Sequence, residues 1–213
     1  MDKSALRELH VLVEHVGPIR AGAHVFREGD PFTSIAAVRG GTVKSYILDR
    51  EGHEQVLGFH FPGEVIGLNA IDPERHPCSA VALDTVFLCR FSFPKIALLA
   101  TRLPGLQAQL FRLLSRDIGI TALLADDHSA DERLAAFLVR TGARLADRRF
   151  AADRFSLVMS RTDIANYLRL APETVSRVLR RFQDEKVLLI DRRDVEVLDP
   201  RRLRALAAPV LRS

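Results

Sequence analysis

Two short runs of helical hydrophobic spacing, separated by a tight break, occupy residues 160–182, SRTDIANYLRLAPETVSRVLRRF. In the first run, Ile164, Ala165 and Leu168 fall on one side of a helix that opens at Ser160, whose hydroxyl can cap the free amides. The second run begins at a proline, which is tolerated in a first helical turn. Its apolar positions are Val175, Val178, Leu179 and Phe182. The pattern predicts a helix-turn-helix.

The outward positions of the second helix are polar and mostly basic. They are Glu173, Ser176, Arg177, Arg180 and Arg181. Such a face suits the major groove of DNA, where arginine pairs with guanine, a carboxylate accepts from cytosine and hydroxyls are permissive. The alternative is an ordinary helical hairpin with a solvated charged face.

The N-terminal half has a different texture. Residues 1–16 predict a short helix with Leu6, Leu9, Leu12 and Val13 on one face. From about residue 17 to 93 the chain consists of short alternating or apolar runs punctuated by glycines, which predicts an antiparallel barrel or sandwich. No nucleotide-binding βαβ unit is indicated.

A long helical stretch follows, over residues 94–124, with a break expected at 102–105. Its second part repeats apolar positions at alternating steps of three and four, which predicts a heptad seam. The seam positions are Leu106, Leu110, Leu113, Asp117, Ile120 and Leu124. Facing Asp117 carboxylates would repel each other across such a seam. The alternatives are a helix packed on its own domain and an Asp117 rotated to the surface.

After a hinge at 126–129, the capping-box-like sequence SADE at Ser129 opens another helix. The segment VLLIDRRDVEVL, after the helix-turn-helix, predicts a hairpin wing with Arg192 and Arg193 at its tip. These arginines would reach backbone phosphate, or they belong to a solvated turn. The final segment, DPRRLRALAAPVL, predicts a terminal helix.

Composition and charge distribution favour a soluble protein with a basic C-terminal part. The chain has 213 residues, enough for two domains, and 47% are hydrophobic and 27% charged. Residues 1–129 carry 13 Lys and Arg against 15 Asp and Glu, a net charge of −2, whereas residues 130–213 carry 18 against 12, a net charge of +6. The basic charge therefore lies with the helix-turn-helix, as phosphate contact requires.

We expect a cytoplasmic protein without a membrane segment, because no run of 18 apolar residues and no secretory signal occurs. The two cysteines, Cys78 and Cys89, form no CxxC pair, so they cannot build a four-thiolate site in one chain. No grouped nucleophile, base and orienting acid is present, so we expect a non-enzyme.

The segment ETVSRVLRRF resembles the recognition helix of the Crp/Fnr family, and the resemblance extends over nearly the whole chain. It implies an α+β fold with a cyclic-nucleotide-binding-type β-roll, a long dimerisation helix and a C-terminal winged helix-turn-helix. The implied domains are residues 1–100, with the short N-terminal helix, residues 101–128, with the hinge, and residues 129–213.

The resemblance also implies a function as a homodimeric transcription regulator on double-stranded DNA. Glu173, Ser176 and Arg177 match the base-reading E-x-x-S-R positions, and the Fnr branch implies an inverted repeat of the class TTGAT-N4-ATCAA. The residues expected at the DNA backbone are Ser160, Thr162, Thr174, Arg180, Arg181, Arg192 and Arg193. Arg169 departs from the family, which often has glycine at that turn.

Cyclic AMP is not expected as the ligand. Family members that bind it use a glutamate for the ribose and an Arg-Ser pair for the phosphate. Leu68 stands in place of the glutamate and Pro77 or Cys78 in place of the arginine, while Ser79 is retained. Without its arginine, a cyclic phosphate lacks its charge-assisted partner.

The ligand sets for the other cofactors of the family are also incomplete in this sequence. Cys89 matches the β-roll ligand of the Fnr [4Fe-4S] cluster, but the other three cysteines have no counterpart, so a cluster requires a further segment upstream. The alternative for Cys89 is an apolar strand residue. Of the seven histidines as haem ligands, His76 is the least implausible, although a loop or surface histidine is the simpler interpretation.

RNA polymerase is the expected protein partner. Glu64 matches an acidic loop position that touches polymerase in the Fnr branch, and the neighbouring Phe61 and Pro62 suggest an exposed apolar contact. A solvated turn carboxylate is the alternative for Glu64. The alternative for the whole chain is a β-roll signalling module that acts on a protein partner without reading DNA.

Overall fold

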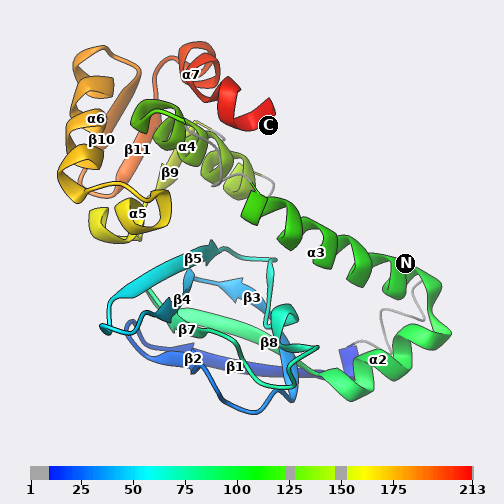
Figure 1. Cartoon of the computed structure of the whole chain (residues 1–213). Helices are drawn as coiled ribbons and strands as arrows, with labels where there is room; N and C mark the ends of the chain where they lie inside the picture. Colours follow the sequence, from blue (N-terminus) through cyan, green and yellow to red (C-terminus); the bar gives the residue numbers. More distant parts are fainter. Residues whose placement is uncertain (1–9, 123–127, 147–152, 213) are drawn as a thin grey trace. The chain divides into compact units, whose positions relative to one another are not determined.

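The computed structural model describes residues 10–122, 128–146 and 153–212, with the backbone alone described over 116–122 and at 212. These residues form two compact units (Figure 1). The first comprises Met1–His53 with Leu57–Ile120, and the second comprises Glu54–Val56 with Thr121–Ser213. No helix in the described part of the chain is long and apolar enough to cross a membrane.

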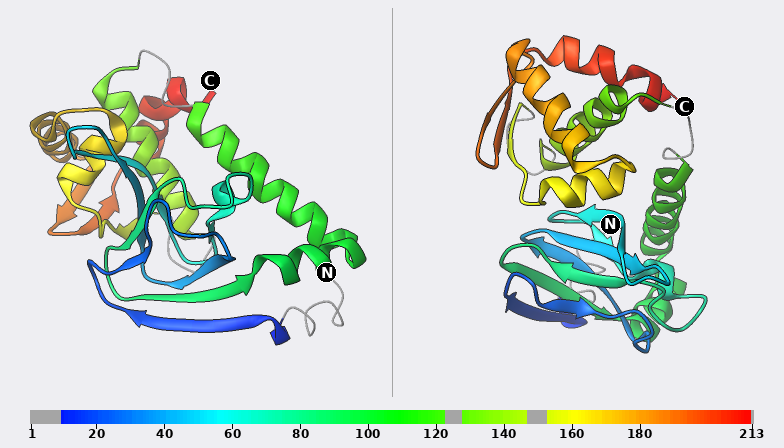
Figure 2. Two further views of the ribbon diagram at one scale, coloured as in Figure 1. Left: turned by 60° about the horizontal axis from the view of Figure 1, so that its bottom comes forward. Right: turned by 60° about the vertical axis from the view of Figure 1, so that its left-hand side comes forward.

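The first unit is built from two four-stranded sheets, in the orders β1-β8-β3-β6 and β2-β7-β4-β5 (Figure 2). The strands are β1 Val13–Ile19, β2 His24–Phe26, β3 Ser34–Gly40, β4 Val43–Leu48, β5 Glu54–His60, β6 Val65–Ile66, β7 Ser79–Ala82 and β8 Val86–Ser92. A 3-10 helix, η1, spans Leu68–Ala70. The register places Val16, Leu88 and Val38 side by side across the first sheet. The predicted antiparallel β architecture is confirmed.

The core of this unit is formed by alternate residues from both sheets. Val38 and Leu88 come from one sheet and Val43 and Ala80 from the other, and all four are buried in one cluster. Strand alternation explains the selection, since every second side chain points to the same face. At the turn before β4, Gly41 is required, because a Cβ there would lie 2.4 Å from a backbone oxygen.

The N-terminal helix predicted over residues 1–16 is wrong from Val13 onward. Residues 10 and 11 are helical, but Val13 begins β1 and pairs with Phe91 of β8. Tertiary pairing outweighs the helical spacing of the leucines here, because the strand completes the edge of a sheet. Residues 1–9 lie outside the described part.

Two helices follow the strands. Helix α2 spans Phe93–Arg102 and α3 spans Pro104–Ala122. They are separated at Leu103, inside the predicted break. Thus the helical stretch and its break are confirmed as far as residue 122.

Of the dimer seam predicted on α3, Leu106 requires correction, and the other positions stay predictions. Leu106 is only 7% exposed and packs with Leu99 and Ala100 of α2. Leu110 and Leu113 pack against Ile35 and other buried residues of the same unit. The helix therefore uses this side to cover its own β-roll, and Leu106 has almost no surface left for a second chain.

The remaining seam positions are only partly described. By helical periodicity, position 117 falls on the same side of α3 as Leu106, eleven residues earlier. The side chains of Asp117 and Ile120 and the whole of Leu124 lie outside the described residues. Of the hinge, only His128 and Ser129 are described, and the Asp126 and Asp127 part is not.

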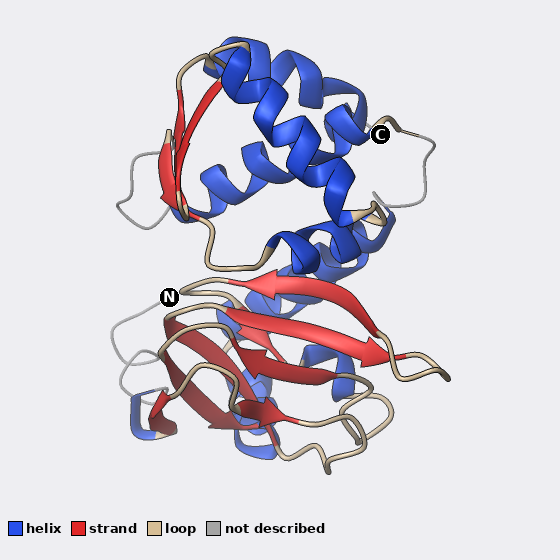
Figure 3. Ribbon diagram, turned by 90° about the vertical axis from the view of Figure 1, so that its left-hand side faces the viewer, coloured by secondary structure: helices blue, strands red, loops and turns tan. Residues whose placement is uncertain are grey.

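The second unit is a set of helices with a small three-stranded sheet, β10-β11-β9 (Figure 3). Its elements are α4 Ala130–Ala146, β9 Arg154–Ser156, α5 Arg161–Leu168, α6 Pro172–Asp184, β10 Leu188–Asp191, β11 Asp194–Val197 and α7 Pro200–Arg212. The capping box predicted at Ser129 is present, since its hydroxyl accepts the Glu132 amide and the Glu132 carboxylate accepts the Ser129 amide. The helix-turn-helix, the hairpin wing and the terminal helix are all confirmed.

One buried histidine links two segments of the first unit. His76 is 6% exposed, stacks on Phe26 at a centroid distance of 3.8 Å and meets Phe32 edge-on. Its Nδ1 has no hydrogen-bond partner among the described residues. Burial lowers the pKa of His76 below its ordinary value of 6.5, and the Asp30 carboxylate opposes this effect. Of the two alternatives expected for His76, the loop position is therefore confirmed and the surface position is wrong.

This environment predicts that acid destabilises the fold through His76. Above about pH 6.5 the imidazole is neutral in both the folded and the unfolded chain. As the pH falls below that value, the unfolded chain binds a proton that the folded chain resists, so stability decreases. Urea unfolding of wild type and His76→Phe between pH 7.5 and 5.5 checks this, and the variant is expected to lose less stability. Equal losses would exclude His76 as the cause.

Candidate DNA-binding surface

Helix α5 begins with a complete capping box. The Ser160 hydroxyl accepts the Asp163 amide at 3.0 Å, and the Asp163 carboxylate accepts the Ser160 amide at 3.2 Å. This reciprocal pair fixes where the helix begins. The Ser160 hydroxyl also donates to the Asp163 carboxylate, so a phosphate would compete with an existing partner.

The turn between α5 and α6 is closed by a residue in left-handed conformation. Arg169 has φ 54° and ψ 47°, and its amide bonds back to Ala165 and Asn166. The Leu170 amide donates to the Ala165 carbonyl at 2.8 Å, which completes the C-terminal cap. An L-residue in this conformation costs about 1 kcal/mol relative to glycine.

Helix α6 presents two distinct faces. The predicted apolar stripe, Val175, Val178, Leu179 and Phe182, is buried, with each side chain at most 3% exposed. Because these four positions are anchored, the rotation of the helix about its axis is fixed. The side chains of Glu173, Ser176 and Arg177 consequently lie on the outer face, and all three are exposed.

The three outward residues lie within two turns of one another. Glu173 and Arg177 are four residues apart and therefore share a side of the helix. Arg177 donates to the Thr174 hydroxyl at 3.4 Å, and Ser176 donates to the Pro172 carbonyl at 2.9 Å. A carboxylate, a hydroxyl and a guanidinium are thus presented together, a set able to read base edges in a major groove.

The residues expected to contact the DNA backbone differ in how available their side chains are. Thr162 and Arg180 are exposed and Thr174 is half-buried. Arg181, in contrast, forms an ion pair with Asp131 at the start of α4. This bond holds α6 against α4, so Arg181 is less available to a phosphate than the other cations.

The wing carries two arginines at its tip, as predicted. Strands β10 and β11 pair antiparallel with Asp191 opposite Asp194, so Arg192 and Arg193 form the two-residue turn. Arg192 has φ 54°. Both arginines line a shallow hollow whose other wall is the segment Leu157–Arg161.

Arg161 is a candidate that sequence reasoning missed. It lines the hollow below the wing and also a larger one of about 540 Å³ beside α6. The larger hollow is lined by Arg161, Ser176, Leu179, Arg180, Gln183, Asp184 and Ile190. Burial lowers the pKa of the Arg161 guanidinium, and among the described residues it makes no hydrogen bond or ion pair.

A signal for Arg161 was present in the sequence. It is the first residue of α5, where the helix dipole disfavours a cation. The unfavourable placement of this charge at the start of a helix is the feature that singles Arg161 out.

In the first unit, the expected exposed contact at Phe61 is wrong. Phe61 is 2% exposed and belongs to the interior. Its amide donates to the Glu64 carboxylate at 3.0 Å, which closes the turn. Pro62 and Glu64 are half-buried.

Of the positions compared with the cyclic-nucleotide site, Leu68 and Cys78 are buried, whereas Pro77, the other candidate for the arginine position, is exposed. Leu68 is 4% and Cys78 is 2% exposed, and the Cys78 sulfur accepts from the Asn69 amide. Burial raises the pKa of the Cys78 thiol. The Ser79 hydroxyl accepts the Glu28 amide at 3.0 Å, so this retained hydroxyl holds a loop.

Cys89 lies on β8, half-buried, directly opposite His15 of β1, with 3.7 Å between the sulfur and Nδ1. A [4Fe-4S] cluster takes four thiolates, and the sequence contains two cysteines, of which Cys78 is enclosed in the interior. These residues do not fit such a cluster. Cys89 is a strand residue, as the alternative expected. Its surroundings are not purely apolar, because its sulfur contacts a histidine.

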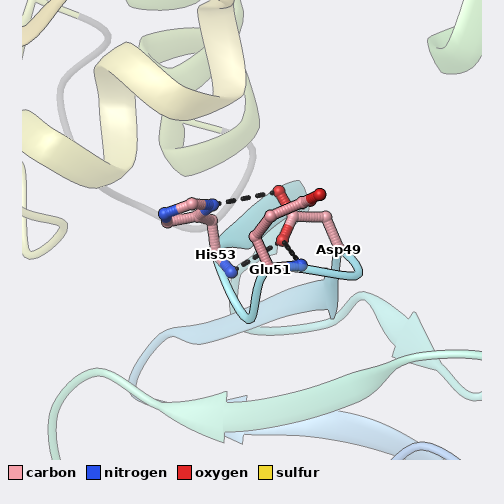
Figure 4. Close-up of side chains that lie close together, drawn as sticks. All are labelled: Asp49, Glu51 and His53. Atoms are coloured by element: carbon pink, nitrogen blue, oxygen red, sulfur yellow. Dashed lines mark hydrogen bonds and ion pairs between the residues drawn. The ribbon is translucent and has the colours of Figure 1, made fainter.

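A third group, Asp49, Glu51 and His53, gathers on the turn between β4 and β5 (Figure 4). The Asp49 carboxylate accepts the amides of Glu51 and His53 at 3.0 and 2.8 Å, and it contacts His53 Nδ1 at 3.3 Å. The hydrogen bond from the His53 amide is the main cause that lowers the pKa of Asp49. The group is explained by the closure of the turn.

Comparison with known proteins connects both units to described families. Residues 17–101 match the cyclic nucleotide-binding domain and residues 132–206 match the Crp-like helix-turn-helix domain. The transcriptional activator protein Anr of Pseudomonas protegens is 45% identical over 209 residues, covering 97% of this chain and 84% of Anr. The fumarate and nitrate reduction regulatory protein of Vibrio cholerae is 37% identical, with 97% and 84% coverage.

A solved structure agrees over the same span. FixK2 from Bradyrhizobium japonicum superposes with a TM-score of 0.81 at 28% identity, covering 91% of this chain and 96% of that one. The α+β fold with a cyclic-nucleotide-binding-type β-roll and a winged helix-turn-helix is thereby confirmed. Members of the family are transcription regulators and not enzymes. This membership disfavours the alternative that the chain is a signalling module that does not read DNA. The chain belongs to the Crp/Fnr family of DNA-binding transcription regulators.

Proposed function

We propose that two copies of this chain bind an inverted repeat of the class TTGAT-N4-ATCAA, with one α6 helix in each half-site. The observation that carries the proposal is the joint exposure of Glu173, Ser176 and Arg177 on a helix whose inner face is fully buried. In such a groove, Arg177 would donate to guanine and Glu173 would accept from cytosine. The cytoplasm, where the chromosome lies, is the proposed location.

Backbone phosphates would be held on both sides of the reading helix. Arg180 and Arg161 share the hollow beside α6, and Arg192 and Arg193 flank the second hollow at the wing. These cations would position the helix without carrying sequence information. Ser160, Thr162 and Thr174 would add hydroxyl contacts, and Arg181 would act mainly through its ion pair with Asp131.

The other side of α3 offers an alternative dimer surface beside the predicted seam. Phe111 is 62% exposed and offers a large apolar side chain on this side. Position 118, an isoleucine, lies seven residues further along and falls on the same side of the helix. Two such helices related by a two-fold axis would bury Phe111 and place the two reading helices on a palindrome.

Each part of the chain has a separate proposed role. We assign residues 1–100 to the β-roll, 101–128 to the dimerisation helix and hinge, and 129–213 to DNA binding. RNA polymerase is the proposed protein partner, because relatives are named transcriptional activators. Glu64, rather than the enclosed Phe61, is the candidate contact.

The β-roll is proposed to work without cyclic AMP. Leu68 is packed inside the unit at the position where the family binds ribose, and neither Pro77 nor Cys78, the candidates for the arginine position, offers a positive charge. No step through a [4Fe-4S] cluster is assigned either, because the residues present do not fit one.

The DNA-reading proposal predicts different effects for two arginines. Arg177→Ala is expected to weaken binding to the repeat by about 1–3 kcal/mol and to relax discrimination at the guanine. Arg192→Ala is expected to weaken specific and random duplexes alike, because it touches only phosphate. Fluorescence anisotropy with both duplexes measures the difference. Equal losses on both duplexes for Arg177→Ala would remove it from the base-reading set.

The dimer proposal predicts that Phe111→Asp shifts the protein toward monomers. Two carboxylates facing each other in place of two rings lose apolar burial and repel. Sedimentation over a dilution series is the measurement. Leu98→Asp is the matched control, since Leu98 is also exposed, at 59%, but lies on α2. A dimer constant equally affected by both variants would contradict the assignment.

The ligand proposal predicts that millimolar cyclic AMP leaves the DNA affinity unchanged and gives no heat of binding. The physical reason is the absence of the arginine that would neutralise the cyclic phosphate. Isothermal titration calorimetry tests this directly. A saturable heat with sub-millimolar affinity would show that another cation replaces the arginine.

A further inference from the structure

Three turns of the DNA-binding unit carry a cation in left-handed backbone conformation. Arg169, Lys186 and Arg192 have φ values of 54°, 56° and 54°. Glycine is the residue best suited to this conformation, since it has no Cβ to crowd the following carbonyl. Arg192 is already a phosphate candidate, so the question is whether the other two cations also have a role.

The fold does not require an arginine at position 169. The hydrogen bonds that close this turn are made by the amides of residues 169 and 170, which glycine would supply equally well. The Arg169 side chain is exposed, and its guanidinium makes no hydrogen bond or ion pair to the described residues. Within the described part of the chain, no contact of the Arg169 side chain offsets the strain at this turn.

The position of Arg169 indicates what the side chain would contact. It lies two residues before Ala171, the N-cap of α6. In a helix-turn-helix, the N-terminal residues of the second helix enter the major groove, so the strand backbone that borders the groove passes close to the preceding turn. A cation at this turn would therefore lie near the phosphates of that strand once the helix is in the groove.

We propose that Arg169 binds a DNA backbone phosphate at the edge of each half-site. The inference rests on the proposed DNA reading by α6 and adds a contact that neither the reading residues nor the wing supplies. Its contribution is independent of base sequence, because a phosphate carries no sequence information.

Lys186 provides a matched control for this proposal. It has the same left-handed conformation and is also exposed, but it follows the C-terminal end of α6. The 13 residues of α6 separate the two cations by roughly 20 Å along the helix. Replacing either cation by glycine removes one charge and the same backbone strain, so only the place of the charge differs.

The test compares wild type, Arg169→Gly, Lys186→Gly and Arg169→Lys as full-length chains. Thermal unfolding is expected to show that neither glycine variant is less stable than wild type. Arg169→Gly is expected to lose about 3–10-fold in affinity for the repeat and for a random duplex alike. The slope of log K against log salt is expected to fall by about one per half-site. Arg169→Lys should restore most of the affinity, and Lys186→Gly should match wild type.

Two results would overturn the phosphate contact. Arg169→Gly and Lys186→Gly could show the same affinity and the same salt slope, or Arg169→Gly could lose affinity for the repeat alone. If the underlying DNA-reading proposal is wrong, wild type itself will bind the repeat no better than a random duplex. This result is distinct from the two results above. A stable Arg169→Gly protein with a reduced salt slope and an unchanged preference for the repeat supports the contact.

Discussion

The burial of one face of α6 is the constraint on which the DNA-binding surface depends. Val175, Val178, Leu179 and Phe182 are almost completely enclosed, and burying such side chains stabilises the unit by about 1.5–3 kcal/mol each. Rotating the helix to present other residues would expose this stripe. The outward direction of Glu173 and Arg177 is thus set by apolar packing, and the ion pair between Arg181 and Asp131 holds the same helix against α4.

A similar division of faces explains α3. One side, with Leu106, Leu110 and Leu113, completes the core of the β-roll, and the other presents Phe111 to solvent. A change in the interior of the roll would therefore act directly on the helix that is proposed to join two chains. The interior itself is filled by side chains such as Leu68 and Cys78, so the signal is not expected to be a cyclic nucleotide.

Local patterns were sufficient to predict much of the fold and part of the site. The cap at Ser160, the buried positions of both helices and the turn at Arg192 follow from spacing and capping chemistry. The side of α3 that packs on the β-roll could not be predicted from spacing. A helix with apolar residues on two sides has no single hydrophobic direction, and only the packed β-roll shows which side is buried. Arg161 was missed because its importance depends on two hollows formed by residues distant in sequence.

The central claim, that paired α6 helices read two half-sites about one turn apart, is tested most directly by changing the spacing of the repeat. Wild-type affinity would be measured for TTGAT-N4-ATCAA, for the same half-sites separated by nine base pairs, and for a scrambled duplex. Five added base pairs rotate one half-site by about half a turn, so the account predicts that affinity falls nearly to the scrambled level. Equal affinity at both spacings would contradict it.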